Sequence, residues 1–168
     1  MAMSKKMLSA LTEQITMELS ASHSYLAMAG WFESQNLPGM AAWMQLQSNE
    51  ERAHALKFFA FVVDRGEDVV LGSIAEPQAV FGSALDVFEQ ALGQEKSVTA
   101  SINGLYTIAN SEGEYEAIPL LTWFINEQVE EEASIDQVVQ DLRRAGDDPQ
   151  VLLMLDRELG GRTADDGE

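Results

Sequence analysis

The sequence predicts an all-α fold: a four-helix bundle with one long crossover between its second and third helices and a short fifth helix near the C-terminus. Four long segments repeat apolar residues at spacings of three and four, the period of an amphipathic helix. The chain contains only four prolines, and two of its breaks are tight while one link is long. Two helical hairpins joined by a long link form a bundle with a single crossover. The alternative, a coiled coil or a helical repeat, is disfavoured by the two tight turns and the single long link.

The first hairpin is predicted from residues 4–34 and 38–64. The motif "NLPG" breaks the chain between these two helices, and "RGED" ends the second. The stretch that follows, "VVLGSIAEPQAVFG", contains two glycines and a proline among several apolar residues. We therefore expect an extended crossover that packs on the surface of the bundle.

The second hairpin is predicted from residues 83–110 and 115–145. Ser83 followed by Asp86 resembles a capping box with Asp in place of Glu, and Pro119 falls in a first turn, where proline is tolerated. Asp148 and Pro149 form an N-cap and N1 pair for the short fifth helix over 149–159. We expect the tail at 160–168 to be disordered and residues 1–168 to form a single domain.

The composition limits the classes of function. Twenty-eight acidic and ten basic residues give a formal net charge of −18, which makes nucleic acid a poor partner and cations good ones. The absence of cysteine excludes disulfides, thiolate-bound metals and thiol nucleophiles, so any metal must have oxygen and nitrogen ligands. No long charge-free apolar run and no secretory signal is present, so we expect a cytoplasmic protein with no membrane partner.

The core-facing stripe of each long helix is apolar at both ends and polar in the middle. These middle positions contain Glu18 and Ser22 in the first helix, Gln47, Glu51 and His54 in the second, Glu95 and Thr99 in the third, and Gln128 and Glu131 in the fourth. A single glutamate in a core costs several kcal/mol or stays protonated, and converging carboxylates also repel one another. Such a cluster is reasonable only if a multivalent cation neutralises it.

The spacing of these residues indicates two matching half-sites. Glu18 and Glu51 are 33 residues apart, as are Glu95 and Gln128, while Glu18 to His54 and Glu95 to Glu131 both span 36. The first two helices therefore repeat as the third and fourth, with the polar positions in register. About five oxygen donors and one imidazole suit two divalent ions that share a bridging carboxylate, and this ligand set accepts Fe²⁺, Mn²⁺ or Zn²⁺.

From Lys5 to Leu159 the chain resembles the non-haem ferritins of the prokaryotic type. The resemblance rests on "TMELSASHSYLAMAGWF", "NEERAH", "GQEKSV" and "NEQVEEEASI", which occur in the expected order and at the expected separations. It implies an iron-storage protein with ferroxidase activity and a ferritin-like bundle fold. Its substrates would be Fe²⁺ and O₂ or H₂O₂, and the Fe³⁺ product would form a mineral inside a homo-oligomeric shell of 24 subunits.

The resemblance also implies a role for each residue that matches a family motif. One iron would be held by Glu18, Glu51 and His54, and a second by Glu51 as the bridge together with Glu95 and Glu131. Gln128 would lie beside the second iron, where it would orient oxygen or water. Tyr25 would donate a hydrogen bond and an electron, although it is equally suited to a core position.

A third iron site of prokaryotic ferritins is matched by Glu50, Glu127 and Glu130, for which an ordinary solvated acidic face is the alternative. The sequence departs from the haem-binding relatives, because Arg52 stands where bacterioferritins place a haem-ligating methionine and Glu131 stands where they place a second histidine. We therefore expect no haem.

Three other functions have to be weighed. A di-iron oxidase or oxygenase without a storage role usually has two Glu-x-x-His motifs and a longer chain, whereas this sequence has one such motif. A DNA-protecting mini-ferritin places its metal between subunits and lacks this set within one subunit. A metal-free acidic bundle that serves only as an interaction module would leave the repeated spacings of 33 and 36 residues unexplained.

Overall fold

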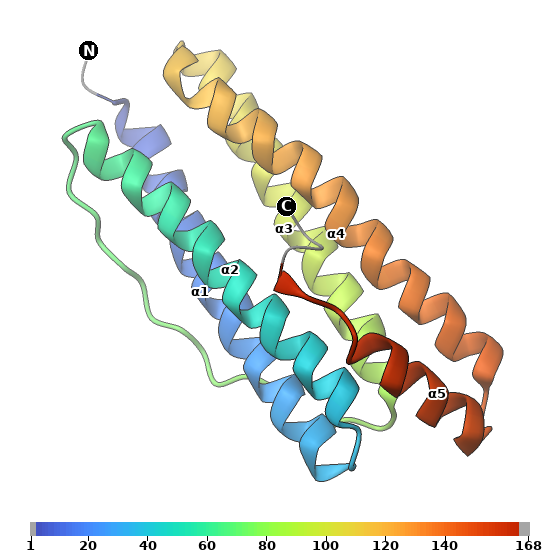
Figure 1. Ribbon diagram of the computed structural model, residues 1–168. Coiled ribbons are helices and arrows are strands. Elements are labelled where there is room, and N and C mark those ends of the chain that lie inside the picture. The colour runs from blue at the N-terminus through green and yellow to red at the C-terminus, as the bar shows by residue number, and fades with distance from the viewer. Residues whose placement is uncertain (1–2, 165–168) are drawn as a thin grey trace.

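The computed structural model describes residues 3–164, which form five α-helices and one short 3-10 helix (Figure 1). The elements in order are α1 (Lys5–Ser34), α2 (Pro38–Asp64), α3 (Ala84–Glu112), η1 (Tyr115–Ala117), α4 (Ile118–Ala145) and α5 (Pro149–Leu159). The third helix runs two residues beyond the predicted end, up to Gly113, whose φ of 73° is easily adopted by glycine. The fourth begins as a 3-10 turn, and its α-helical part starts just before Pro119.

The four long helices form two antiparallel hairpins, α1 with α2 and α3 with α4. The segment between α2 and α3 has no regular structure and runs the length of the first hairpin before α3 begins (Figure 1). It contacts that hairpin at Gly72, whose N–H donates to the Thr16 hydroxyl at 3.0 Å. The predicted all-α bundle with one long crossover and a short fifth helix is therefore confirmed.

The starts of α3 and α5 follow from local capping chemistry. The Ser83 hydroxyl accepts from the Asp86 N–H at 3.1 Å, and the Asp86 carboxylate accepts in return from Gly82, one residue before the cap. The Asp148 carboxylate accepts from the Gln150 N–H at 2.9 Å and so caps α5.

The core consists of two apolar clusters, one toward each end of the bundle. One cluster includes Phe32, Met44 and Phe88, and the other includes Phe58 and Phe124, whose rings stack with centroids 4.0 Å apart. The glutamates of the polar middle belong to neither cluster, although they are themselves buried. The bundle therefore holds an acidic layer between two hydrophobic layers.

The short helix α5 packs against α2 and α4, and a glycine makes the contact with α2 possible. A Cβ atom on Gly39 would lie 1.7 Å from the backbone oxygen of Asp156, so only glycine allows this approach. The Asp156 carboxylate is buried and accepts from the Met40 N–H at 2.8 Å. This docking directs the residues after α5 toward the middle of α2.

The tail is expected from its sequence to be disordered, but its described part, residues 160–164, is ordered. Arg162 is half-buried and its guanidinium donates to Gln47 and Glu50 of α2, so residues 160–164 have a defined path. The rest of the tail, residues 165–168, lies outside the described residues. The sequence alone does not show this path, because Arg162 and Glu50 meet only after α5 has docked.

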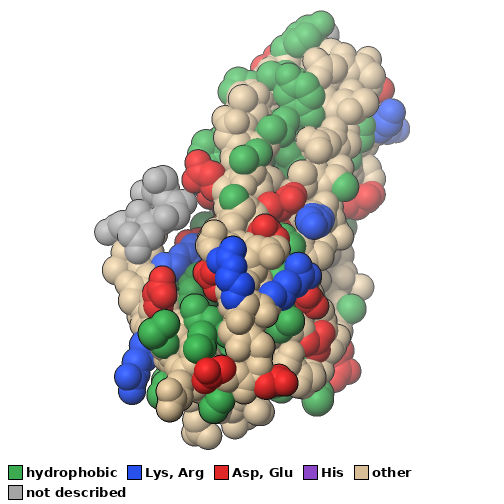
Figure 2. Space-filling model, turned by 90° about the vertical axis from the view of Figure 1, so that its right-hand side faces the viewer, with side chains coloured by type: hydrophobic (Ala, Val, Ile, Leu, Met, Phe, Trp, Pro, Cys, Tyr) green, Lys and Arg blue, Asp and Glu red, His purple; other side chains and the backbone are tan. Residues whose placement is uncertain are grey.

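The face of the molecule drawn in Figure 2 shows no single acidic site. On the face shown in Figure 2, acidic side chains are spread among basic and apolar ones rather than gathered in one patch. Among residues 3–164, no helix combines the length and the apolar character that crossing a membrane requires.

Candidate metal centre

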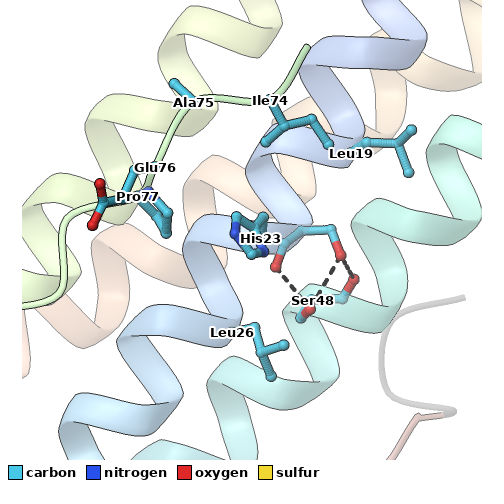
Figure 3. Close-up of a pocket in the computed structure, with 9 residues that line it drawn as sticks. Leu19, His23, Leu26, Ser48, Ile74, Ala75, Glu76 and Pro77 are labelled. Carbon is cyan, nitrogen blue, oxygen red and sulfur yellow. Dashed lines mark hydrogen bonds between the residues drawn. The ribbon is translucent and has the colours of Figure 1, made fainter. Parts of the chain in front are cut away.

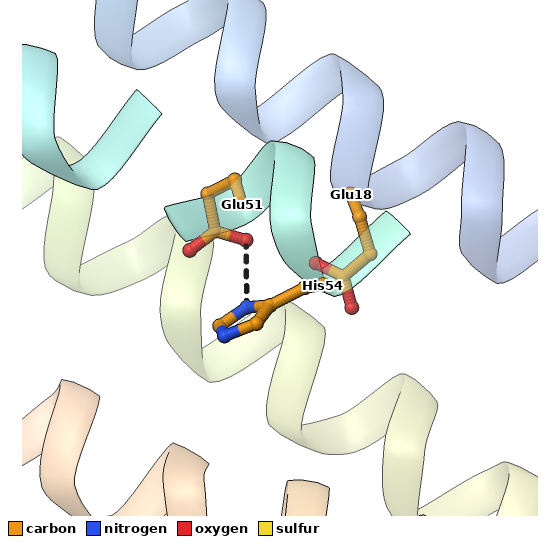
Figure 4. Close-up of side chains that lie close together, drawn as sticks. All are labelled: Glu18, Glu51 and His54. Carbon is orange, nitrogen blue, oxygen red and sulfur yellow. Dashed lines mark ion pairs between the residues drawn. The ribbon is translucent and has the colours of Figure 1, made fainter. Parts of the chain in front are cut away.

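Three side chains from α1 and α2 converge at the centre of the bundle (Figure 4). Glu18, Glu51 and His54 each offer a ligand atom, and these atoms lie within 4.8 Å of one another. Their exposed fractions are 0%, 1% and 4%, so the group is closed to bulk water. Glu51 and His54 occupy positions i and i+3 of α2, which face the same side of a helix.

A second group of ligand atoms joins α2 to α4. It consists of His54, Glu127 and Glu131, again within 4.8 Å of one another. His54 belongs to both groups, because its Nδ1 lies 3.6 Å from Glu51 while its Nε2 lies 3.9 Å from Glu127. Both distances are too long for hydrogen bonds, so the imidazole lies between the two groups without a hydrogen bond to Glu51 or Glu127.

Glu95 of α3 is also buried in this layer, but donors from its own surroundings hold it. The Tyr25 hydroxyl donates to one carboxylate oxygen at 2.5 Å, and the Gln128 amide donates to the other at 3.1 Å. Gln128 also contacts the Thr99 hydroxyl at 3.3 Å. Tyr25 and Gln128 therefore both orient Glu95.

Several buried polar atoms of this layer have no hydrogen-bond partner among the described residues. They are Glu18 Oε2, both carboxylate oxygens of Glu51, His54 Nδ1 and Gln128 Oε1. Buried polar groups in proteins are nearly always satisfied, and an unsatisfied carboxylate is especially costly. Their clustering fits a bound cation, because oxygen and imidazole-nitrogen donors are the ligands that a divalent transition metal accepts.

Burial raises the pKa of every carboxyl group at the centre. Desolvation raises the pKa of Glu18 to about 7 and that of Glu131 to about 8, with the charge of Glu95 adding to both. The pKa of Glu51 is raised well above its usual value by burial and by the charges of Glu95 and Glu18. Near neutral pH these groups retain protons, which a divalent cation would displace.

The imidazole of His54 responds in the opposite direction. Burial and the nearby Lys57 ammonium lower its pKa to about 4, so it is neutral at physiological pH and can offer a lone pair. The Lys57 ammonium lies 3.3 Å from the ring centroid of Trp123, and that ring meets the imidazole edge-on with centroids 5.6 Å apart. Lys57 and Trp123 thus cover one side of the histidine, a contact that the sequence reasoning did not predict.

Two glutamines that the sequence reasoning did not assign to the site support its carboxylates. Gln14 donates to Glu18 at 2.8 Å and Gln47 donates to Glu131 at 2.8 Å. Both glutamines are buried, and each lies four residues before a site glutamate of its own helix. The repeated Gln-x-x-x-Glu pattern, again separated by 33 residues, is the signal that could have identified them.

The structure does not bring the predicted third trio together. Glu130 is exposed, and Glu50 lies against Arg162 with both carboxylate oxygens 3.0 Å from the same guanidinium nitrogen. Among the described residues, Glu127 instead groups with His54 and Glu131. Burial raises the pKa of both Glu50 and Glu127, whereas Arg162 acts to lower that of Glu50.

A surface hollow of about 480 Å³ lies elsewhere, where residues 74–77 of the crossover pass over α1 and α2 (Figure 3). Its lining is mostly apolar, with Leu19, Leu26 and Ile74, and it also includes the exposed His23. Neither of the metal-ligand groups found among residues 3–164 includes a residue of this hollow.

Comparison with known proteins gives consistent results. Residues 8–145 match the family model described as a ferritin-like domain. The chain is 38% identical over 166 residues to the bacterial non-haem ferritin of Staphylococcus saprophyticus, covering 99% of both chains. It is 37% identical to that of Staphylococcus aureus strain MRSA252 over 164 residues, covering 98% of this chain and 99% of the relative.

Two solved structures are similar along almost the whole chain. One is an open-pore ferritin from the hyperthermophilic archaeon Archaeoglobus fulgidus, with a TM-score of 0.95, 41% identity and coverage of 96% of this chain and 99% of that one. The other is an engineered closed form of the same ferritin, with a TM-score of 0.94, 41% identity and coverage of 96% and 98%.

Proposed function

Because the chain belongs to the ferritin family and is related to the non-haem ferritins, we propose that it stores iron and oxidises it at the buried acidic layer. In this proposal two Fe²⁺ ions bind per subunit and are oxidised to Fe³⁺. The Fe³⁺ then forms a mineral inside a shell of 24 subunits. We keep the predicted cytoplasmic location as part of this proposal.

One observation supports the proposal most strongly. Glu51 is 1% exposed, neither of its carboxylate oxygens has a hydrogen-bond partner among the described residues, and neighbouring carboxylates raise its pKa further. A residue placed only for packing would not be a glutamate here, because burying an unsatisfied carboxyl group destabilises the fold. A bridging position between two cations would use both oxygens and remove the repulsion.

The other residues would then have distinct roles. Glu18 and His54 would complete the ligands of the first ion, while Glu95 and Glu131 would hold the second. Gln14 and Gln47 would orient the carboxylates to which they donate, as outer ligands commonly do around metals.

Gln128 and Tyr25 would act beside the metals. The unpartnered Oε1 of Gln128 would orient oxygen or water near the second ion. The Tyr25 hydroxyl would hold Glu95 in its ligand position, and it would also be available to supply an electron. A third iron site at Glu50, Glu127 and Glu130 stays part of the proposal, although in this structure Glu130 is exposed and Glu50 pairs with Arg162.

The oxidation balances without any further reductant. Each Fe²⁺ gives up one electron, so a pair of ions supplies two electrons. With two protons, these electrons reduce O₂ to H₂O₂. If H₂O₂ is the oxidant, the same two electrons and two protons reduce it to two water molecules. The ions act as Lewis acids and as the electron source, while the protein fixes their positions. Carboxylate ligands favour the higher charge of Fe³⁺, which makes the electron transfer easier.

Anaerobic titration with Fe²⁺ followed by admission of air tests the proposal. We expect a rapid oxidation phase that saturates at about two irons per subunit, and then slower loading far beyond that ratio. Glu51→Ala should abolish the rapid phase, whereas Glu13→Gln, at an exposed position of α1, should leave it unchanged. Loading that stops at two irons would instead identify a di-iron oxidase without a storage role. Size-exclusion chromatography reports whether the shell assembles.

A further inference from the structure

Arg162, in the segment after α5, contacts the edge of the acidic layer directly. One guanidinium nitrogen lies 3.0 Å from both carboxylate oxygens of Glu50, and another donates to Gln47 Oε1 at 2.5 Å. The guanidinium also lies over the Trp43 ring, 4.9 Å from its centroid. The Arg162 side chain is 15% exposed and that of Glu50 is 22% exposed, so this ion pair is largely shielded from water.

These contacts connect Arg162 to the proposed second iron position through one intermediate residue. Gln47 accepts from Arg162 with its oxygen and donates to Glu131 with its nitrogen at 2.8 Å. Because an amide has one oxygen and one nitrogen end, the contact with Arg162 fixes which end faces Glu131. Arg162 thereby orients the amide that holds Glu131.

The position of Arg162 is also the position that a further cation would need. A metal ion at Glu50 would have to compete with the guanidinium for the carboxylate oxygens, and the positive charge of Arg162 repels any cation nearby. Gly160 is fixed against α2, because a Cβ atom there would lie 2.9 Å from the Gly39 Cα, so a movement of the segment would have to begin at Gly161, where glycine allows backbone rotation. The ion pair therefore holds the residues after Gly160 over the Glu50 edge.

We propose that Arg162 is a displaceable cation that closes the Glu50 edge of the iron-oxidation site, so that a third metal ion binds at Glu50 only when the C-terminal segment swings away. This proposal rests on the proposed function, since it requires two ions already bound at the central glutamates. Binding at the edge and release of the segment are then one coupled equilibrium, and each favours the other. The segment regulates how many ions a subunit holds and when the edge opens.

Zinc provides a redox-inert probe of this coupling. The wild-type chain contains no cysteine, so Ala164→Cys gives a single attachment point for a nitroxide spin label two residues beyond Arg162. Zn²⁺ binding would be followed by calorimetry and label mobility by electron paramagnetic resonance, in the assembled protein. Arg162→Ala is the test variant, and Arg157→Ala, an exposed residue of α5, is the matched control.

We expect the label to stay restricted while the first two zinc ions bind and to become mobile as the third binds. Arg162→Ala should make the label mobile without metal and should tighten binding of the third ion about three- to tenfold. Glu50→Gln should also release the label without metal, but it should remove the third ion. Arg157→Ala should behave as the wild type does.

Each failure identifies the idea that it contradicts. If two zinc ions bind normally but the label does not respond to a third, or if Arg162→Ala leaves the third affinity unchanged, the gating role of Arg162 is wrong and the proposed function is untouched. If no zinc binds at the central glutamates, the proposed function is wrong and the gating role falls with it.

Discussion

Neutralising one buried carboxyl group tests whether the acidic layer destabilises the metal-free protein. We predict that Glu18→Gln makes the metal-free protein more stable at pH 8. The amide keeps the oxygen that accepts from Gln14, and its new N–H groups lie within reach of Glu51, whose oxygens have no partner among the described residues. The substitution therefore removes a buried charge without removing a contact.

The size of the effect follows from the raised pKa. Burial raises the pKa of Glu18 from 4.5 to about 7, and each pKa unit corresponds to about 1.4 kcal/mol. At pH 8 the group is ionised in both the folded and the unfolded chain, so the charge destabilises the folded state by about 3 kcal/mol. This corresponds to a rise in Tm of about 6–12 °C for the variant, given a chain of this length.

The gain should depend on pH in a defined direction. A carboxyl group whose pKa is raised on folding keeps its stabilising contribution below pH 4.5, the ordinary value, and loses it as the pH rises through about 7. The advantage of Glu18→Gln should therefore be below about 1 kcal/mol at pH 5 and full at pH 8. His54 titrates between about 4 and 6.5, but it is present in both proteins and cancels in the comparison.

Thermal unfolding followed by circular dichroism, at one protein concentration and with chelator present, measures the difference. Adding Zn²⁺ at pH 8 should stabilise the wild type strongly and the variant much less, so their order of stability should reverse. Glu13→Gln, on the same helix but exposed, should change neither result. A variant that is no more stable than the wild type at pH 8, or equally favoured at pH 5, would refute the reasoning.

Three further results are expected. Tyr25→Phe should destabilise the protein by about 1–3 kcal/mol in urea unfolding. The substitution removes the hydroxyl that donates to a Glu95 oxygen at 2.5 Å, so that oxygen loses its donor. An unchanged unfolding midpoint would contradict this prediction. Zinc binding should release more protons per subunit at pH 6.5 than at pH 9, as calorimetry in buffers of different ionisation enthalpy reports, because Glu18 and Glu131, with pKa values of about 7 and 8, are largely protonated only at the lower pH. Gly39→Ala should undock α5, because its Cβ would lie 1.7 Å from the Asp156 oxygen, and faster tryptic cleavage of the C-terminal segment would report it.

The central part of the site could be predicted from the sequence because helical geometry is local and regular. Once Glu18 and Glu51 are placed on core-facing stripes, the 33-residue repeat puts Glu95 and Gln128 at the same level of the bundle. The structure places all four in one buried layer. Burial of charged residues is rare, so a glutamate inside an apolar stripe is an informative signal.

The contacts that tertiary packing creates could not be predicted in this way. Arg162 reaches Gln47 across 115 residues of sequence, and only because Gly39 lets α5 dock against α2. The tail itself, "RTADDGE", has the polar composition of a disordered segment, and no periodicity marks Arg162 within it. Grouping Glu127 with His54 likewise depends on how α2 and α4 approach each other.

The repeat relates the two halves of the site in position but not in chemistry. In the half formed by α1 and α2, Glu51 and His54 present atoms without hydrogen-bond partners among the described residues. In the half formed by α3 and α4, Glu95 accepts from Tyr25 and Gln128, and Glu131 accepts from Gln47. A metal ion in the second half must therefore compete with internal donors, whereas an ion in the first half satisfies unpaired atoms.

This difference in hydrogen bonding between the two halves predicts the order in which metal ions bind. The first divalent ion should bind between Glu18, Glu51 and His54, because there it gains ligands that lose no existing hydrogen bond. Crystals soaked with less than one equivalent of Zn²⁺ should show anomalous density at that position before any appears near Glu95. Equal density at both positions would mean that the hydrogen bonds donated by Tyr25 and Gln128 do not oppose metal binding. The two half-sites would then bind metal with similar free energies, as their matching sequence spacing alone would suggest.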